Sequence, residues 1–332
     1  MSLTVPAEWA PHRAMWLGFP SHADLWLENL EPAQAEVAAL ARALAGPGRE
    51  RVRLMVCGVE AEAAARRLLG GVPGIEFVPG RFGDIWLRDT GPIFLDPGHA
   101  AAFRFNGWGG KYILEGDEEV AAQIAGHVGA RLEPHGFVLE GGAIDHDGAG
   151  TILTTRQCLL NANRNAGWDR PAAEAALAAA LGVRKVLWLG EGLMNDHTDG
   201  HVDNLARFVA PGVVTCPMGF GANDPNTTAY NDAARDLAAM TDADGRTLRV
   251  LRIPSPGRVQ DEDGEVVAAS HMNFLIANGA VIAPLYGDEL AGALLVEALQ
   301  VMFPDREVIG LSSRAILSGG GSFHCITQQG PA

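Results

Sequence analysis

The chain has 332 residues, 48% of them hydrophobic, with 40 acidic and 25 basic residues and a formal net charge of -15. This length and apolar content are sufficient for a large globular core, organised as one large domain or two. The acidic balance, without any run of lysine and arginine, excludes a typical nucleic-acid-binding protein and favours small cationic ligands.

The N-terminal segment, residues 1–11, is short and of mixed composition, and it lacks the pattern of a signal peptide. No apolar run approaches the roughly 18 residues that a membrane-spanning helix needs. We therefore expect a cytoplasmic protein that does not interact with membranes. The four cysteines (Cys57, Cys158, Cys216 and Cys325) are scattered without a CxxC pair, so neither a disulfide framework nor a zinc knuckle is indicated.

After a tryptophan-rich start, helix and strand patterns alternate. Residues 32–45 predict an alanine-rich helix, residues 51–57 a strand and residues 61–69 a second helix closed by two glycines. This alternation is typical of an α/β protein.

A hairpin pattern then recurs along the chain, in which two apolar runs flank a Pro-Gly, Asp-Gly or Asn-Gly turn. Alanine-rich helical stretches separate these hairpins. The recurrence predicts a radial or stacked repeat rather than a doubly wound sheet, within a single domain covering residues 1–332. The expected hairpins are residues 93–103, 143–153, 205–215 and 273–283, and the expected helices are residues 120–129, 171–181, 231–240 and 289–303.

Polar clusters containing carboxylates precede three of the hairpins, at residues 84–92, 140–142 and 195–204. A fourth cluster, at residues 319–325, holds the corresponding place near the C-terminus. Because equivalent positions in a ring of repeats converge on its axis, we expect the four clusters to meet there.

Cys325 in the last cluster is the candidate nucleophile, because three consecutive glycines before it let a ligand approach the backbone closely. The alternative is a small buried thiol. His201 and Asp203 are expected on one face of an extended segment, where they would supply an acid/base partner. His324, next to the nucleophile on an expected extended segment, should point the opposite way from Cys325 and be structural.

Asp89, Glu140 and Asp203 would then surround one thiol. Like charges raise the pKa of a thiol and weaken it as a nucleophile, unless the substrate brings positive charge. A guanidinium does so, because its N–H fork matches carboxylates in two-point contact and its carbon is electrophilic. The cluster composition therefore favours a cationic amidine or guanidine substrate.

Two other functions fit parts of the sequence. His197 and His201, four residues apart among aspartates, resemble the ligands of a metal-dependent hydrolase, although Thr198-Asp199-Gly200 between them is a poor helix segment. A propeller-like scaffold that binds amines without catalysis is the second alternative.

As a set, the motifs resemble the agmatine deiminases of the guanidino-group-modifying superfamily, which are grouped with the Porphyromonas-type peptidylarginine deiminases. The resemblance covers nearly the whole length. The motifs that carry it lie at residues 5–12 with 15–20, 86–92, 105–112, 139–142, 154–165, 200–204 and 319–329.

The resemblance implies a fivefold pseudosymmetric β/α propeller, the pentein fold, and the hydrolysis of agmatine to N-carbamoylputrescine and ammonia without a metal or organic cofactor. It also implies the site residues. These are Cys325 as nucleophile through a thiouronium intermediate, His201 as acid/base, Asp89 and Asp203 as guanidinium-binding carboxylates, Glu140 as support for the guanidinium and the histidine, and Trp86 as pocket wall. Gly320 and Gly321 would let a flat guanidinium lie against the backbone.

The chain departs from the family pattern at four positions. His197 and Arg156 each replace a usual acidic residue, Asp199 replaces an asparagine, and His271 replaces a tyrosine. These changes bear on the far end of the substrate, so free arginine and peptidyl-arginine stay open beside agmatine. Arg156 or His197 could hold the carboxylate of arginine. Residues 105–116 and 219–226 are glycine-rich candidates for a lid, and a homo-oligomer is compatible with the sequence.

Overall fold

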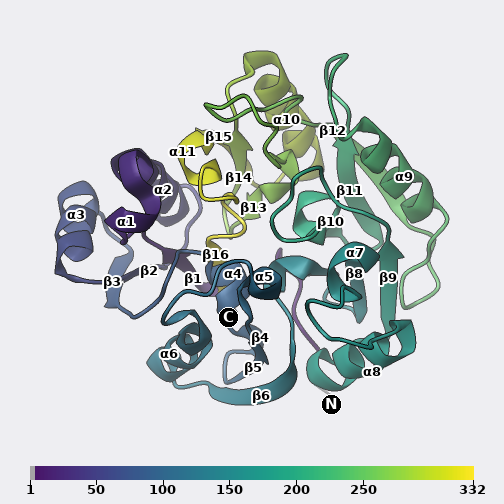
Figure 1. Ribbon diagram of the computed structural model, residues 1–332, viewed down its shortest axis with the longest axis horizontal. Coiled ribbons are helices and arrows are strands. Elements are labelled where there is room, and N and C mark those ends of the chain that lie inside the picture. Colours follow the sequence, from purple (N-terminus) through teal and green to yellow (C-terminus); the bar gives the residue numbers. More distant parts are fainter. Residues whose placement is uncertain (1–3) are drawn as a thin grey trace.

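Five small β-sheets form a ring around a central axis in the computed structural model, which describes residues 4–332 (Figure 1). Long helices lie on the outer side of this ring. The architecture is the fivefold pseudosymmetric β/α propeller that the sequence resemblance implied.

Four of the sheets share one topology, in which an antiparallel hairpin is followed by a third strand parallel to the second. A helix covers each connection from the second strand to the third. The units are β4 (Ile93–Asp96), β5 (His99–Arg104), α6 (Val120–Val128) and β6 (Arg131–Val138); β7 (Ile144–His146), β8 (Thr151–Thr155), α8 (Arg170–Leu181) and β9 (Lys185–Leu189); β10 (Arg207–Ala210), β11 (Val213–Met218), α9 (Thr227–Ala238) and β12 (Arg249–Pro254); and β13 (Leu275–Ile276), β14 (Ala280–Leu285), α10 (Glu289–Met302) and β15 (Glu307–Ser312). All four predicted hairpins and their helices are confirmed.

The fifth sheet joins the two ends of the chain. The last strand, β16 (Thr327–Pro331), pairs antiparallel with β1 (His12–Gly18), and β2 (Val52–Val56) continues the sheet parallel to β1 after helix α2 (Leu30–Ala45). A further strand, β3 (Ile75–Pro79), follows α3 (Val59–Leu69) and pairs with β2. The pairing of β16 with β1 closes the ring and fixes the C-terminal segment in place.

The helices α8 and α10 begin at capping aspartates, and α8 ends at a glycine, as their local sequences predict. Asp169 and Asp288 accept hydrogen bonds from the first-turn backbone N–H groups of α8 and α10, a contact worth about 1 kcal/mol. Gly182 follows α8 in the left-handed conformation, at φ 68°, which glycine adopts without steric cost. In α2, Val37, Leu40 and Leu44 are buried on the face toward the core.

A short helical turn precedes the first strand of each hairpin and carries the polar clusters toward the axis. These turns are α4 (Leu87–Thr90), η3 (Gly141–Ala143), η4 (Val202–Asn204) and η5 (His271–Asn273), and a hydrogen-bonded turn at residues 323–326 precedes β16. The prediction that His201 and Asp203 lie on one extended segment is therefore wrong, because Asp203 belongs to η4. The prediction of an extended segment around His324 is wrong for the same reason.

The remaining short elements lie in the connections. They are α1 (Ala23–Trp26), η1 (Leu27–Asn29), α5 (Gly107–Gly110), η2 (Asp117–Glu119), α7 (Arg156–Leu159) and α11 (Arg314–Leu317). Within residues 4–332, no helix combines the length and the apolar character needed to cross a membrane.

Candidate active site

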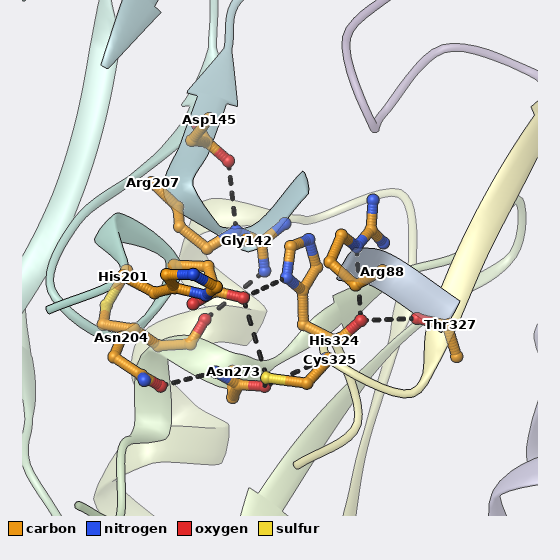
Figure 2. A network of polar contacts seen from close by, with 12 residues as sticks. Arg88, Gly142, Asp145, His201, Asn204, Arg207, Asn273, His324, Cys325 and Thr327 are labelled. Carbon is orange, nitrogen blue, oxygen red and sulfur yellow. Dashed lines mark hydrogen bonds and ion pairs between the residues drawn. The ribbon is translucent and has the colours of Figure 1, made fainter. Parts of the chain in front are cut away.

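The turn before β16 places the thiol of Cys325 at the axis of the ring. Its Sγ lies 3.0 Å from Oδ1 of Asn273 and 3.7 Å from Oδ2 of Asp203. Burial, followed by the charges of Asp203 and Asp89, raises the pKa of this thiol well above its ordinary value. Figure 2 shows His201, Asn273, His324 and Cys325, which come from separate segments, gathered in one polar network. Cys325 is thus a buried thiol surrounded by polar and titratable side chains.

Gly142 marks the point where the predicted clusters meet. Its backbone N–H donates to Oδ1 of Asp89 at 2.9 Å. A Cβ at this position would lie 2.6 Å from Nδ1 of His201 and 3.0 Å from both Oδ2 of Asp203 and Oδ1 of Asp89. Only glycine leaves room for these three side chains, so the predicted convergence of the clusters is confirmed.

The His201 imidazole is fully buried, and neither ring nitrogen has a hydrogen-bond partner among the described residues. Its Nδ1 lies 3.8 Å from Oδ2 of Asp89. Burial lowers the pKa of His201 to about 3, so the ring is neutral at neutral pH.

The two carboxylates beside the thiol differ in protonation. Burial, then the charges of Asp203 and Glu140, raises the pKa of Asp89 to about 8. Asp89 is held by neutral donors, including the indole N–H of Trp108 at 2.9 Å. Burial also opposes the ionisation of Asp203, but the hydrogen bond and charge of His324 outweigh it and lower the pKa of Asp203. At pH 7, therefore, Asp89 retains its proton and Asp203 carries a negative charge.

Glu140 is paired with Arg164, whose Nε lies 2.5 Å from Glu140 Oε1. Burial raises the pKa of Glu140 even though Arg164 opposes that shift. The same guanidinium contacts Oδ2 of Asp199 at 2.9 Å and the carbonyl of Thr198 at 2.9 Å. Sequence reasoning gave Arg164 no role, although it lies in the motif at residues 154–165, where a lone arginine could have been matched to a buried carboxylate.

Among the described residues, one group has metal-ligand character: single ligand atoms of Glu140, Cys158 and His201 lie within 4.8 Å of one another. This set fits a metal poorly, because Arg164 already neutralises the Glu140 carboxylate. The alternative pair of His197 and His201 is not brought together as a ligand group. His201 is buried, whereas His197 is exposed and its Nδ1 contacts the Tyr112 hydroxyl at 2.9 Å.

A cavity of about 300 Å³ leads to Cys325 and has aromatic walls. The Asp84 carboxylate accepts hydrogen bonds from the indole N–H groups of Trp26 at 3.0 Å and Trp86 at 2.6 Å. Gly321 packs on the Trp86 ring, where a Cβ would lie 2.5 Å from a ring carbon. The residues that line the cavity include Trp26, Glu28, Asp84, Trp86, Asp89, Trp108, Tyr112, His197, Gly320, Gly321 and Cys325.

Several residues marked in the sequence lie away from this cavity. Arg156 is exposed and lines a different surface cleft with Gln157 and Gly190, so the prediction that it could hold the carboxylate of a bound arginine is wrong. His271 is buried, with Nδ1 2.9 Å from the carbonyl oxygen of Pro254. Residues 220–224 of the second candidate lid line another cleft, whereas the first candidate lid, residues 105–116, supplies cavity walls.

A five-bladed β/α propeller with a thiol, an imidazole and carboxylates at its axis defines the guanidino-group-modifying class of proteins. Residues 4–331 match the family model described as Porphyromonas-type peptidyl-arginine deiminase. The chain belongs to this family.

Known relatives match over almost the whole length. The agmatine deiminase of Stutzerimonas stutzeri is 42% identical over 355 aligned residues, which cover 99% of this chain and 95% of the relative. The solved agmatine deiminase of Enterococcus faecalis is 35% identical, with a TM-score of 0.92 and coverage of 99% of this chain and 95% of that one. A C. jejuni agmatine deiminase solved with substrate bound is 27% identical, with a TM-score of 0.88 and coverage of 100% and 97%.

Proposed function

We propose that this protein is a hydrolase that converts agmatine and water to N-carbamoylputrescine and ammonia, using residues 1–332 as one catalytic domain. Full-length similarity to agmatine deiminases supports the reaction. The single observation that carries it is the placement of the Cys325 thiol, which lines an aromatic cavity, 3.7 Å from an ionised Asp203. Such a thiol works as a nucleophile only beside a cationic substrate.

The first chemical step forms a covalent bond to sulfur. Asp89 and Asp203 orient the guanidinium, whose charge lowers the cost of forming the Cys325 thiolate. The thiol proton passes to the neutral His201 imidazole as sulfur attacks the central carbon. His201 then returns the proton to the departing nitrogen, and ammonia leaves a thiouronium on Cys325.

Hydrolysis regenerates the enzyme. Neutral His201 takes a proton from water as the water oxygen attacks the thiouronium carbon. The carbon–sulfur bond then breaks, the hydroxyl proton of the adduct returns to the Cys325 sulfur, the ureido product leaves, and His201 gives its proton to the released ammonia or to solvent. The charge of Asp203 favours the protonated state of this imidazole, and Glu140, fixed by Arg164, lies beside the ring. Every group in both steps belongs to the chain, the substrate or water.

The cavity favours agmatine over arginine. Its walls carry the carboxyl groups of Glu28, Asp84 and Asp89, and the described residues that line it include no lysine or arginine. An α-carboxylate would therefore enter without a cationic partner, which is costly in a partly buried site. A small cationic guanidino compound without a carboxylate suits these walls.

Ammonia release from agmatine, arginine and a blocked arginine peptide, measured side by side, tests the proposal. We expect agmatine to have the largest kcat/KM, and Cys325→Ala to abolish turnover while agmatine still binds. Cys57→Ala is the matched control, because Cys57 is a half-buried cysteine outside the cavity; it should stay active and sensitive to iodoacetamide. Appreciable turnover by Cys325→Ala would contradict the mechanism.

A further inference from the structure

The imidazole of His324 lies between the carboxylates of Asp203 and Glu8. Its Nδ1 is 2.8 Å from Oδ2 of Asp203, and its Nε2 is 3.0 Å from Oε2 of Glu8. The side chain is buried, with 3% of its surface exposed. Because an ionised carboxylate oxygen can only accept a hydrogen bond, both ring nitrogens must donate, which requires the doubly protonated imidazolium.

Glu8 is a fixed anion at the far end of this arrangement. Its Oε1 accepts from the backbone N–H of Ile276 at 2.8 Å, and its Oε2 also pairs with the guanidinium of Arg207. Burial opposes ionisation of Glu8, but Arg207 and His324 outweigh it and hold the pKa of this carboxyl well below its ordinary value. Glu8 belongs to the motif at residues 5–12, to which neither the sequence reasoning nor the reaction above gave a role.

Arg207 is anchored in turn by Asp145, at 3.2 Å from its Nε, and by the carbonyl oxygens of Met272 and Phe274. Figure 2 shows Asp145 and Arg207 in the same network as His324 and Cys325. The N-terminal segment, β7, β10 and the η5 region therefore all contribute to the position of one imidazolium. Besides Asp203 and Glu8, the charged or titratable groups around it are Arg88, Asp145, His146, His201 and Arg207.

The bond from His324 has a geometric consequence for Asp203. It occupies Oδ2, whereas the other oxygen, Oδ1, is buried and has no hydrogen-bond partner among the described residues. A buried carboxylate oxygen without a donor is costly and is expected to receive one from a ligand. With Oδ2 held by His324, Oδ1 is the acceptor left for a substrate N–H group.

Within residues 4–332, the second carboxylate of the site has no such cation hydrogen-bonded to it. Asp89 receives hydrogen bonds from Trp108 and Gly142, which are neutral donors. His324 therefore makes Asp203 the anion of the pair and leaves the proton to Asp89.

We propose that Glu8 and His324 are positioning residues, which act through Asp203 by holding its carboxylate ionised and turned so that Oδ1 faces the substrate guanidinium. This inference rests on the proposed deiminase reaction for its effect on turnover. The effect of Glu8 and His324 on the Asp203 carboxylate does not depend on substrate and can be measured without it.

The substrate-free test follows the side-chain carboxyl carbons of aspartate by ¹³C NMR as the pH is changed, with the Asp203 signal identified by its loss in Asp203→Asn. In the wild-type protein we expect this signal to keep the chemical shift of an ionised carboxylate down to about pH 5. Below that pH, acid unfolding of the protein limits the measurement. In His324→Gln the signal should titrate at higher pH. If Asp203 of the wild-type protein titrates near pH 7, the proposal is overturned. This outcome requires no variant and does not depend on which substrate the enzyme uses.

Kinetics with agmatine test the consequence. Loss of the cation raises the pKa of Asp203, so a second ionisation, beside that of Asp89, should enter the acidic limb of the kcat/KM profile and move its lower part to higher pH. KM should rise about tenfold with a smaller change in kcat. Glu8→Gln keeps the shape of the side chain and should move the limb less in the same direction. A uniform loss of activity at every pH, with the limb unmoved, would show a merely structural role and overturn the proposal.

Glu50→Gln is the matched control. Glu50 forms another buried carboxylate–histidine pair, with Oε1 2.9 Å from Nδ1 of His12, and neither residue lines the active-site cavity. This variant should lower the melting temperature but leave the acidic limb in place. An equal shift in Glu50→Gln would mean that any buried pair moves the limb, which would contradict the inference. Wild-type protein that is inactive on agmatine would refute the proposed function, while the carboxyl titration would still decide the role of His324.

Discussion

The amide oxygen of Asn273 accepts hydrogen bonds from both the Sγ and the backbone N–H of Cys325, at 3.0 and 3.2 Å. Its amide nitrogen donates to Oδ1 of Asn204 at 2.6 Å, so the surrounding network fixes which atom faces the thiol. A neutral acceptor at this distance directs the S–H group without adding charge. Asn273 therefore orients the nucleophile while sparing it a further rise in pKa.

Asn273→Asp should lower kcat/KM for agmatine about a hundredfold at neutral pH. The change places a carboxylate where the amide oxygen was, and its charge raises the already raised pKa of the Cys325 thiol further. The pH dependence of alkylation by iodoacetamide would show the shift directly. Asn231→Asp, at an exposed position of α9, is the control and should behave like the wild type. Unchanged alkylation in Asn273→Asp would contradict this role.

Gly142→Ala should abolish activity, because the new Cβ would lie 2.6 Å from Nδ1 of His201 and 3.0 Å from the nearest oxygens of Asp89 and Asp203. The nearest groups must shift, and displacement of catalytic groups by even about 1 Å costs on the order of a hundredfold in rate. Gly126→Ala is the control, since a Cβ there meets nothing within 4 Å on helix α6. That variant should keep full activity and gain about 1 kcal/mol of stability. An active Gly142→Ala enzyme would show that the site tolerates this displacement.

Local signals were sufficient to predict much of this fold. Turn residues at 97–98, 147–148, 211–212 and 278–279 identified the four hairpins, and their recurrence predicted a ring in which the polar clusters converge. The pairing of β16 with β1 had no local signal, because its two strands lie at opposite ends of the sequence. The number of sheets came from the family resemblance rather than from the pattern.

The missed site residues share a physical cause. Asn273 and Arg164 are single polar residues whose roles arise only when distant segments pack against Cys325 and Glu140. His324 was placed on an extended segment and dismissed, because the turn at residues 323–326 depends on contacts that the sequence does not display. Residue types near a site could be predicted, but the direction in which each side chain points required the backbone.

Binding of agmatine should release about one proton at pH 7. Asp89 is protonated in the empty site, since its pKa is about 8, and an incoming guanidinium favours the ionised form. Calorimetry of Cys325→Ala in buffers of different ionisation enthalpy would count the protons without turnover. Asp89→Asn in the same background should bind more weakly and release no proton. Equal proton release by the two proteins would assign the proton to another group.

The same shift predicts how Asp89 affects stability. Its pKa in the folded protein is raised above the ordinary value of about 3.9, so the folded state binds this proton more tightly than the unfolded state. The resulting stabilisation is complete below about pH 4 and is lost as the pH rises through about 8. Asp89→Asn, which carries no charge, should therefore melt at a higher temperature than the empty wild-type protein above pH 8, although it is inactive. A lower melting temperature there would contradict the shift.

His197→Glu should strengthen the binding of agmatine. His197 lines the cavity that leads to Cys325 and is held at its Nδ1 by the Tyr112 hydroxyl, at 2.9 Å. A glutamate there would put a carboxylate near the free ammonium end of agmatine, a partly exposed ion pair worth about 1 kcal/mol. KM for agmatine should fall about fivefold, with a smaller gain at high salt, and KM for arginine should not fall. Tyr112→Phe removes only the hydroxyl contact and should change KM for agmatine less than about twofold. A glutamate variant that improves arginine as much as agmatine would show that the far end of the substrate does not reach position 197.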